Sequence, residues 1–527
     1  MRRLHLLGLA AMVLSNLACA TLVGGPSTAR PAAPLPPTPA SMVTARPSPT
    51  APGASPTAVA DATPLATLGP VQEAPVDLDV GLLPGVDLPE VNTQYAIDVT
   101  VTFNADGTAT LTGVSRFVYT NHETAPISDL VLMLWPNNRD QYLSAMTLDS
   151  VSSAGRELEL VAGGEGEIAQ RFALDAPLPP GDSVDVSTAF SVEARPGIDD
   201  SGAARFGLTN DVLLAPTFYP LIPRRIDGDW DTQLAPPGGD TTNSDTATFV
   251  YVVRAPADLA IVGSGVVVDE QVEGDQRRQT LVAAPMRDLA LVVGPLTRTS
   301  TTVDGVIVNA YLLERHAEYA DDMLAFAGDQ LRTLNQRVGP YPFTELDVID
   351  APGAFGGIEY PGEIFIGVVG PDRFFEVATV HEVGHQWFYS VVGDDQLREP
   401  WLDEAFASYS EVLYFEAKDG PEARVEYVAD FRRYYEAVLS DAALPIGLPV
   451  DGYPAESDYY AAVYAKGAVF LDQLREVMGD DAFFSFLQAT YTEHRFGFVT
   501  GQDVQARAEA ACACELDGLF DEWVYGP

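Results

Sequence analysis

Short runs of alternating apolar and polar residues fill the first half of the foldable part of this chain. Between residues 95 and 103 every second side chain is apolar, residues 104–107 have turn composition, and the alternation resumes at residues 108–112. A period of two is typical of a strand with one buried face, and turn residues between two such runs indicate a hairpin. Further short β-like runs lie at residues 130–134, 183–190, 248–253, 260–268 and 289–293. The pattern predicts a mostly antiparallel β domain over residues 86–297.

Beyond residue 297 the apolar spacing becomes helical. Large apolar residues recur at three- and four-residue intervals from 317 to 338, followed by a strand at 345–349 and a glycine-punctuated strand pair within 353–367. One amphipathic helix is expected to begin near Asp372, and a second to run from about Trp401 to Lys418. We therefore predict an α+β, multidomain fold in which a mainly helical domain, residues 298–527, follows the β domain.

The N-terminus has the composition of an export signal followed by a linker. Two arginines precede an apolar stretch at residues 4–14 and small residues around Ala20, which predicts a signal peptide over residues 1–20. Residues 21–85 are rich in Pro, Ala, Thr and Ser, a composition that cannot bury a core and predicts a disordered linker. Cleavage after Ala20 would give a secreted protein, whereas lipidation of Cys19 would give a cell-envelope lipoprotein. We favour the lipid on Cys19, which would be the protein's only attachment to a membrane.

Charge excludes one class of partner. The 527 residues carry 75 acidic and 30 basic side chains, a net charge of −45. Nucleic acid is excluded as a partner because phosphate binding requires clustered Lys and Arg. The acidity indicates a self-repelling, soluble surface, with salt adaptation and guidance of cationic substrates as alternatives. The sequence leaves open whether Cys512 and Cys514, separated by one residue, form a disulfide.

The string His381-Glu382-Val383-Gly384-His385 carries the chemistry. Residues four apart on a helix share a face, so both imidazoles can reach one metal ion. Glu404 follows 19 residues later, in the first turns of the second predicted helix. Zinc accepts two histidine nitrogens and one carboxylate oxygen and keeps a fourth position for water, from which Glu382 can take a proton. The sequence predicts one Zn²⁺ per chain, held by His381, His385 and Glu404, with Glu382 as general base.

Four strings together resemble the gluzincin metallopeptidases of the aminopeptidase N family, which includes membrane alanyl aminopeptidase and leukotriene hydrolase. They are Gly356-Gly357-Ile358-Glu359-Tyr360, the His381–His385 motif, the run from Trp401 to Tyr409, and Tyr464-Ala465-Lys466-Gly467. The resemblance implies a thermolysin-like catalytic domain over residues 298–527. It also implies a short form without the C-terminal helical-repeat domain of the larger relatives.

The resemblance adds roles for residues that spacing alone does not single out. It implies that Tyr464 donates a hydrogen bond to the developing oxyanion. It implies that Glu359 binds the free α-amine of a peptide, while Gly356 and Gly357 let the substrate backbone approach.

This chain departs from the usual family pattern at several positions. Ile358 stands where methionine is usual and Tyr360 where asparagine is frequent, which puts the fineness of amine recognition in doubt. Asp403 replaces a usual asparagine and Ala405 a usual glycine. The β domain has no counterpart of the glutamine that often helps to hold the amine, and residues 215–220 are the expected border of the cleft.

Two residues on the helix of Glu404 are candidates for orienting a metal ligand. Ser408 and Glu411 lie four and seven residues after Glu404, on the same helix face. Each could hold a histidine in place from behind, and the sequence does not choose between them.

The combined prediction is an exported zinc aminopeptidase that removes N-terminal residues from peptides with a free N-terminus. It would use a metal-activated water and form no covalent intermediate. An endopeptidase on the same scaffold is the alternative if Glu359 does not capture the amine. A non-catalytic surface binding protein with a peptidase-like fold is the alternative from another class.

Overall fold

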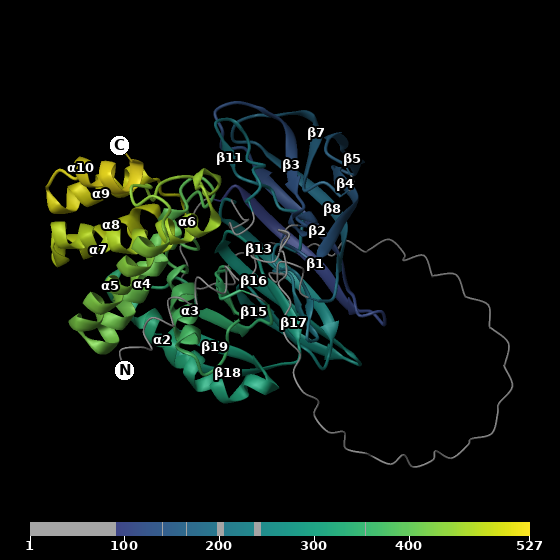
Figure 1. Ribbon diagram of the computed structural model, residues 1–527. Helices are drawn as coiled ribbons and strands as arrows, with labels where there is room; N and C mark the ends of the chain where they lie inside the picture. Colours follow the sequence, from purple (N-terminus) through teal and green to yellow (C-terminus); the bar gives the residue numbers. More distant parts are fainter. Residues whose placement is uncertain are drawn as a thin grey trace, which may run out of the picture. The chain divides into compact units, whose positions relative to one another are not determined.

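Strand β1 (Thr93–Phe103) lies inside an eight-stranded sheet and has the alternating burial that its sequence predicts. The computed structural model describes residues 91–139, 141–164, 166–197, 205–236, 244–353 and 355–526. The predicted signal peptide, Cys19 and the linker lie outside these residues. Figure 1 shows the strands in the purple-to-teal part of the chain and most helices in the green-to-yellow part.

The eight-stranded sheet has the order β15-β16-β13-β1-β2-β8-β4-β5. Only the β1–β13 pair is parallel in this sheet, so the prediction of a mostly antiparallel β domain is confirmed. The other strands are β2 (Ala109–Thr120), β4 (Ser144–Ser153), β5 (Arg156–Glu157), β8 (Ser183–Ala194), β13 (Ala247–Pro256), β15 (Val266–Glu273) and β16 (Gln276–Met286).

Three small sheets complete the β domain. Their orders are β3-β7-β6, β14-β17-β10-β9 and β11-β12. The bounds are β3 (Ile127–Met133), β6 (Glu159–Ala162), β7 (Ala169–Leu178), β9 (Gly207–Thr209), β10 (Val212–Leu214), β11 (Arg225–Ile226), β12 (Asp229–Trp230), β14 (Ala260–Gly263) and β17 (Leu291–Gly294), with a 3₁₀ turn η2 (Trp135–Asn137).

The second half of the chain starts with a five-stranded sheet and continues with helices. The sheet order is β18-β19-β20-β22-β21, formed by β18 (Leu296–Val303), β19 (Val306–Leu313), β20 (Glu345–Asp350), β21 (Gly357–Ile358) and β22 (Glu363–Ile366). The helices are α2 (Ala320–Arg337), α3 (Arg373–Gly384), α4 (Trp401–Asp419), α5 (Pro421–Val438), α6 (Glu456–Tyr460), α7 (Gly467–Met478), α8 (Asp480–His494), α9 (Gly501–Cys512) and α10 (Asp517–Phe520). The short helical segments are η3 (Glu314–Tyr319), η4 (Val450–Gly452), η5 (Ala461–Lys466) and η6 (Asp521–Tyr525), of which η5 and η6 are π-helical.

Local sequence signals account for the helix ends. Helix α3 begins directly after Asp372, which keeps an extended backbone, and α4 ends at Gly420, whose φ of 96° favours glycine. The helix predicted from residue 317 starts three residues later, because a 3₁₀ segment occupies its first turn. Cys512 and Cys514 form a disulfide at the end of α9, which the sequence left open.

A buried interface joins the β domain to the five-stranded sheet. Apolar side chains of β10, β14 and β17 form one core cluster with residues of β19, β20 and β22, among them Leu313, Ile349 and Phe365. Arg287 of the β domain also donates to the carbonyls of Tyr389 (2.9 Å) and Gly497, and Thr246 donates to the carbonyl of Phe496 (2.9 Å). The β domain thus contacts the segment that follows the histidine motif.

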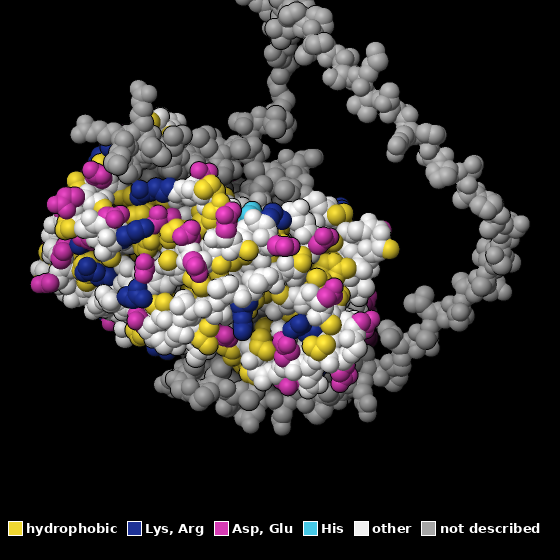
Figure 2. Space-filling view, turned by 90° about the horizontal axis from the view of Figure 1, so that it is seen from below, with side chains coloured by type: hydrophobic (Ala, Val, Ile, Leu, Met, Phe, Trp, Pro, Cys, Tyr) yellow, Lys and Arg dark blue, Asp and Glu magenta, His cyan; other side chains and the backbone are white. Residues whose placement is uncertain are grey.

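Charged side chains of one sign do not gather into a single patch on the face shown in Figure 2. Figure 2 shows Asp and Glu side chains spread over the face in view and interleaved with Lys and Arg. None of the helices among the described residues is long and apolar enough to span a membrane.

A row of polar side chains crosses the five-stranded sheet, from the exposed Ser300 to the buried Asn309, Asp347 and Glu363. Ser300, Asn309, Asp347 and Glu363 are register partners on successive strands. Asn309 accepts from the Ser300 hydroxyl (2.6 Å) and donates to Asp347 (2.7 Å). Burial raises the pKa of Asp347 to about 7, although Asn309 acts against the shift, and burial also raises the pKa of Glu363.

This row predicts that stability falls as the pH rises through the range in which Asp347 loses its proton. The folded protein holds that proton up to about pH 7, whereas the unfolded chain releases it near 3.8, the ordinary pKa of an aspartate side chain. The free energy of unfolding therefore decreases between about pH 4 and pH 7, by at most about 1.4 kcal/mol per pH unit for one such group. We expect Asp347→Asn to flatten this dependence, as measured by urea unfolding at several pH values. The control is Asp329→Asn at an exposed site, and an unchanged slope in Asp347→Asn would contradict the assignment.

Candidate metal centre

Helices α3 and α4 approach each other closely because small residues line their contact. A Cβ at Gly384 would lie 2.3 Å from the Ser410 hydroxyl and 3.3 Å from the Ala407 backbone. Any side chain at position 384 would therefore push the two helices apart. Helix α3 carries His381, His385 directly follows it as the C-cap residue, and α4 carries Glu404, so this contact sets the width of the site.

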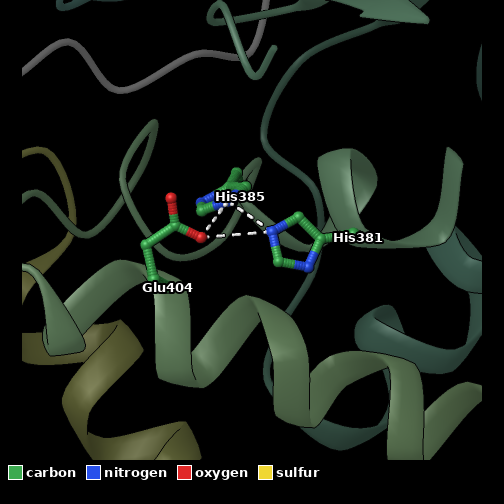
Figure 3. A group of neighbouring side chains, drawn as sticks. All are labelled: His381, His385 and Glu404. Atoms are coloured by element: carbon green, nitrogen blue, oxygen red, sulfur yellow. Dashed lines mark hydrogen bonds and ion pairs between the residues drawn. The ribbon is translucent and has the colours of Figure 1, made fainter. Parts of the chain in front are cut away.

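The three predicted ligands converge as the sequence pattern required. The Nε2 atoms of His381 and His385 are 3.1 Å apart, and Glu404 Oε2 lies 3.2 and 3.4 Å from them (Figure 3). All three side chains are at most 5% exposed. One atom from each residue faces a common point, which is the arrangement that a single cation needs.

The other nitrogen of each histidine is occupied by a hydrogen bond. His381 Nδ1 lies 2.8 Å from Glu411 Oε1, and His385 Nδ1 lies 3.1 Å from the Phe388 carbonyl. The carboxylate and the carbonyl can only accept a hydrogen bond, so Nδ1 is the donor in each histidine. The lone pair of each Nε2 is therefore directed at the common point. Glu411 is held in turn by the Tyr427 hydroxyl at 2.6 Å.

These contacts choose between the two candidates for orienting a ligand. Glu411 contacts His381 directly, whereas the buried Ser408 is not among the hydrogen-bond partners of the three ligands in the described part of the chain. Glu411 lies two turns after Glu404 on α4, beside His381 at the start of the histidine motif. Its longer side chain reaches the imidazole.

The donor set fits a divalent cation such as zinc. Burial acts to lower the pKa of His381, but the carboxylates of Glu404 and Glu411 outweigh it and raise that pKa well above its usual value. The imidazoles of His385 and His381 likewise hold the pKa of Glu404 below its usual range, although burial acts against them. The pocket therefore favours positive charge. Two nitrogens and one carboxylate oxygen are the ligands of a catalytic zinc site.

Glu382 lies against strand β21 beside the ligands. A Cβ at Gly357 would lie 2.4 Å from Glu382 Oε1, so only glycine leaves room for this carboxylate. Its Oε2 atom is buried and has no hydrogen-bond partner among the described residues. Burial raises the pKa of Glu382 to about 8, with the neighbouring His381 acting against the shift. A carboxylate in that state can take up and release a proton near neutral pH.

Tyr464 reaches the site from a π-helical segment. Segment η5 (Ala461–Lys466) adds a residue to one turn, a distortion that often occurs at functional sites. The Tyr464 hydroxyl donates to Glu404 Oε1, and its ring stacks on His381 with centroids 5.9 Å apart. The structure thus brings the tyrosine singled out by resemblance to the metal ligands.

Glu359 lies on the other side of His385, in a network with two glutamines. Gln396 donates to Glu359 Oε1 (3.3 Å) and to Asp403 Oδ2 (2.9 Å). Gln386, next to His385 in sequence, donates to the Tyr360 carbonyl (3.1 Å) and accepts from the Gly362 amide (2.8 Å). The loop that bears Glu359 is thereby fixed to the end of the histidine motif.

Several of these residues were not predicted from the sequence. Gln386, Gln396 and Tyr427 act only through tertiary contacts, and no spacing rule points to them. For Gln386 the position directly after His385 was an available signal.

Residues 215–220, expected to border the cleft, turn their polar groups elsewhere. The hydroxyls of Thr217 (2.6 Å) and Tyr219 (3.1 Å) both donate to Asp288. Neither hydroxyl is therefore offered to a substrate amine.

Comparisons with known proteins agree with this geometry. The peptidase family M1 domain matches residues 372–523. Aminopeptidase N of Lactobacillus helveticus is 27% identical over 261 residues, 45% of this chain and 31% of the relative. Aminopeptidase M1 of Arabidopsis thaliana is 25% identical over 300 residues, 53% of this chain and 34% of the relative. The chain thus spans about a third of the length of these curated relatives.

A solved structure extends the similarity to the β domain. The M1 zinc metallopeptidase of Deinococcus radiodurans superposes with a TM-score of 0.61 at 20% identity, covering 83% of this chain and 95% of the other. A mutant of that protein bound to a Tyr-Ser-Ala substrate gives a TM-score of 0.60 at 20% identity, covering 84% of this chain and 96% of the other. These structures confirm the α+β fold, with a β domain followed by a helical domain.

The contact between Glu411 and His381 makes a prediction about metal affinity. Glu411→Gln removes the charge that holds the imidazole, so we expect zinc to bind roughly tenfold to a hundredfold more weakly. Competition with a chromogenic chelator measures this affinity. Glu422→Gln, at an exposed position of α5, is the control with the same charge change. Equal affinities for wild type and Glu411→Gln would show that this contact does not support the metal.

Proposed function

We propose that this chain, whose residues 372–523 match the peptidase family M1 domain, is a zinc-dependent aminopeptidase. It would hydrolyse the first peptide bond of peptides that have a free N-terminus. The single observation that carries this proposal is the convergence of His381, His385 and Glu404, with Glu382 and Glu359 beside them. The Deinococcus neighbour bound to a Tyr-Ser-Ala substrate supports peptides as the substrate class.

His381, His385 and Glu404 would hold the zinc ion. When bound, zinc makes its water acidic enough to lose a proton near neutral pH and polarises the scissile carbonyl. The rest of the chemistry belongs to the chain's own side chains. Glu411 and the Phe388 carbonyl keep both imidazoles in the tautomer that presents Nε2.

Glu382 would accept the proton of the attacking water and pass it to the leaving amine. Its buried Oε2 has no partner among the described residues, so one oxygen is available for that proton. A cation at the three ligands would lower the pKa of Glu382 from about 8 toward neutrality, because it stabilises the charged carboxylate.

Tyr464 would donate its hydrogen bond to the oxyanion in the transition state. The hydroxyl already lies among the metal ligands, on Glu404 Oε1. A short rotation could transfer it to a substrate oxygen. A donor directed at charge that develops only in the transition state raises kcat rather than ground-state binding.

Glu359 would distinguish an aminopeptidase from an endopeptidase. Its carboxylate is 8% exposed, and its charge acts on both Glu382 and His385. A buried carboxylate at that place favours an ammonium group over a neutral amide by a charge-assisted hydrogen bond. A substrate bound through its amine would present only its first peptide bond to Glu382.

Two matched peptides test this proposal. We expect the zinc-loaded protein to cleave a leucyl peptide with a free amine at least about a hundredfold faster than the same peptide acetylated at the amine. Release of the first residue is followed by liquid chromatography. Glu382→Ala is the control, and it should retain zinc while losing turnover by about 10²–10⁴-fold. Equal cleavage of the two peptides would indicate an endopeptidase, and unchanged activity in Glu382→Ala would rule out the hydrolytic role.

We further propose that the protein is exported and carries a lipid on Cys19. The arginines, the apolar stretch and the small residues of the first 20 positions support export. Mass spectrometry of the mature N-terminus tests this: a diacylglycerol-modified Cys19 is expected. A free N-terminus at Thr21 would mean secretion without an anchor, and retention of Met1 would contradict export.

A further inference from the structure

We propose that Asp403 supplies a second negative charge to the pocket for the peptide's α-ammonium group, with Gln396 holding it beside Glu359. This inference rests on the proposed aminopeptidase function and deepens it. Asp403 would contribute to specificity in two ways: its charge attracts the ammonium group, and its hydrogen bond from Gln396 helps to position Glu359.

The first argument is the distance between the two carboxylates. One ligand atom each from Glu359, His385 and Asp403 lies within 4.8 Å of the others. A nitrogen at ordinary hydrogen-bond distance, about 2.8 Å, can span two oxygens separated in this way. Asp403 itself is fully buried, so its charge is hardly screened by solvent and acts strongly at this range.

The second argument is the position of Gln396. Its amide nitrogen donates to both carboxylates and thereby fixes their separation. Gln396 is only 4% exposed, and its Oε1 atom is buried without a hydrogen-bond partner among the described residues. A buried acceptor without a donor is unfavourable. A substrate ammonium beside Glu359 would provide the missing donor.

The third argument concerns which cation fits. A second metal ion at Glu359, Asp403 and His385 would need a nitrogen of His385. Its Nδ1 already faces the Phe388 carbonyl, and its Nε2 faces His381 and Glu404. Neither nitrogen is left for another ion. An ammonium group needs no histidine ligand and is satisfied by oxygen acceptors.

The charge balance points in the same direction. Besides Glu382, the acidic side chains Glu359, Asp403, Glu404 and Glu411 surround the two imidazoles, and none is more than 8% exposed. One divalent ion carries too little charge to neutralise four carboxylates. A positively charged substrate group reduces the remaining repulsion, which a neutral acetylated terminus cannot do.

The fold provides hydrogen-bond partners for the buried carboxyl group of Asp403. It lies in the first turn of the 19-residue helix α4, where the helix dipole favours negative charge. Its Oδ1 accepts from the Glu404 amide (2.8 Å) and its Oδ2 from Gln396. The charge therefore comes from the helix that also carries a metal ligand, and the polar groups of residues 215–220 are engaged elsewhere.

Asp403→Asn tests the proposal, because asparagine has the same shape and can still accept from the Glu404 amide. Binding is measured by calorimetry in zinc-loaded Glu382→Ala protein, which avoids turnover. The probes are leucinamide and 4-methylpentanamide, which differ only by the amino group. We expect Asp403→Asn to weaken leucinamide binding roughly tenfold to a hundredfold and to leave 4-methylpentanamide binding unchanged.

The controls separate this proposal from the one on which it rests. Glu399→Gln removes a carboxylate from the same loop whose side chain accepts a hydrogen bond from the Gly501 amide, and it should change neither affinity. Zinc content is measured in each variant, and Asp403→Ser replaces Asp403→Asn if the latter does not fold. Equal weakening of both probes, or of neither, would overturn the role of Asp403. If the Asp403-containing protein itself did not prefer leucinamide, the aminopeptidase function would fail instead.

Discussion

The close contact between α3 and α4 is the constraint on which the whole site depends. It brings the imidazoles of His381 on α3 and of His385 directly after it within 3.4 Å of the Glu404 carboxylate on α4 and of each other. Gly384 makes the approach of α3 to α4 possible. On another face of α4, Gly467 does the same for α7, because a Cβ at Gly467 would lie 2.5 Å from that of Ala405. Glycine is less favourable than alanine inside a helix, so each of these residues gives up local stability for separation. The ligand geometry is therefore a property of packing between three helices, not of the histidine motif alone.

Burial of so many carboxylates creates an electrostatic problem that the surrounding side chains solve in part. Tyr427 and Tyr464 each donate to one of them, Gln396 donates to two, and the α4 dipole favours those in its first turn. What remains is an excess of negative charge in a region that solvent reaches poorly. Such a region binds cations strongly because the charges are weakly screened and already positioned. A metal ion and, in the proposed function, the ammonium group of a substrate would both reduce this excess of negative charge.

The sequence was sufficient for those parts of the site that follow from a local period. The four-residue interval between His381 and His385, the helix that starts at Trp401, and the strand alternation at 95–103 were all predicted correctly, because each depends on geometry within one element. Gln396 and Tyr427 could not be predicted, since Gln396 donates to Glu359 and Tyr427 to Glu411, each on another element. The choice of Glu411 over Ser408 is intermediate: the helix face was predictable, but the distance to His381 depends on how tightly α3 and α4 pack.

The β domain acts on the metal site through one buried arginine. Arg287, 2% exposed, donates to the Tyr389 carbonyl, and the preceding carbonyl, that of Phe388, receives the Nδ1 proton of His385. Tyr389 has a φ of 114°, a conformation that residues other than glycine rarely adopt and that surrounding contacts must maintain. Burial lowers the pKa of Arg287 to about 10, so the guanidinium stays charged at neutral pH and its hydrogen bonds stay strong. The β domain therefore holds the turn that sets the orientation of His385.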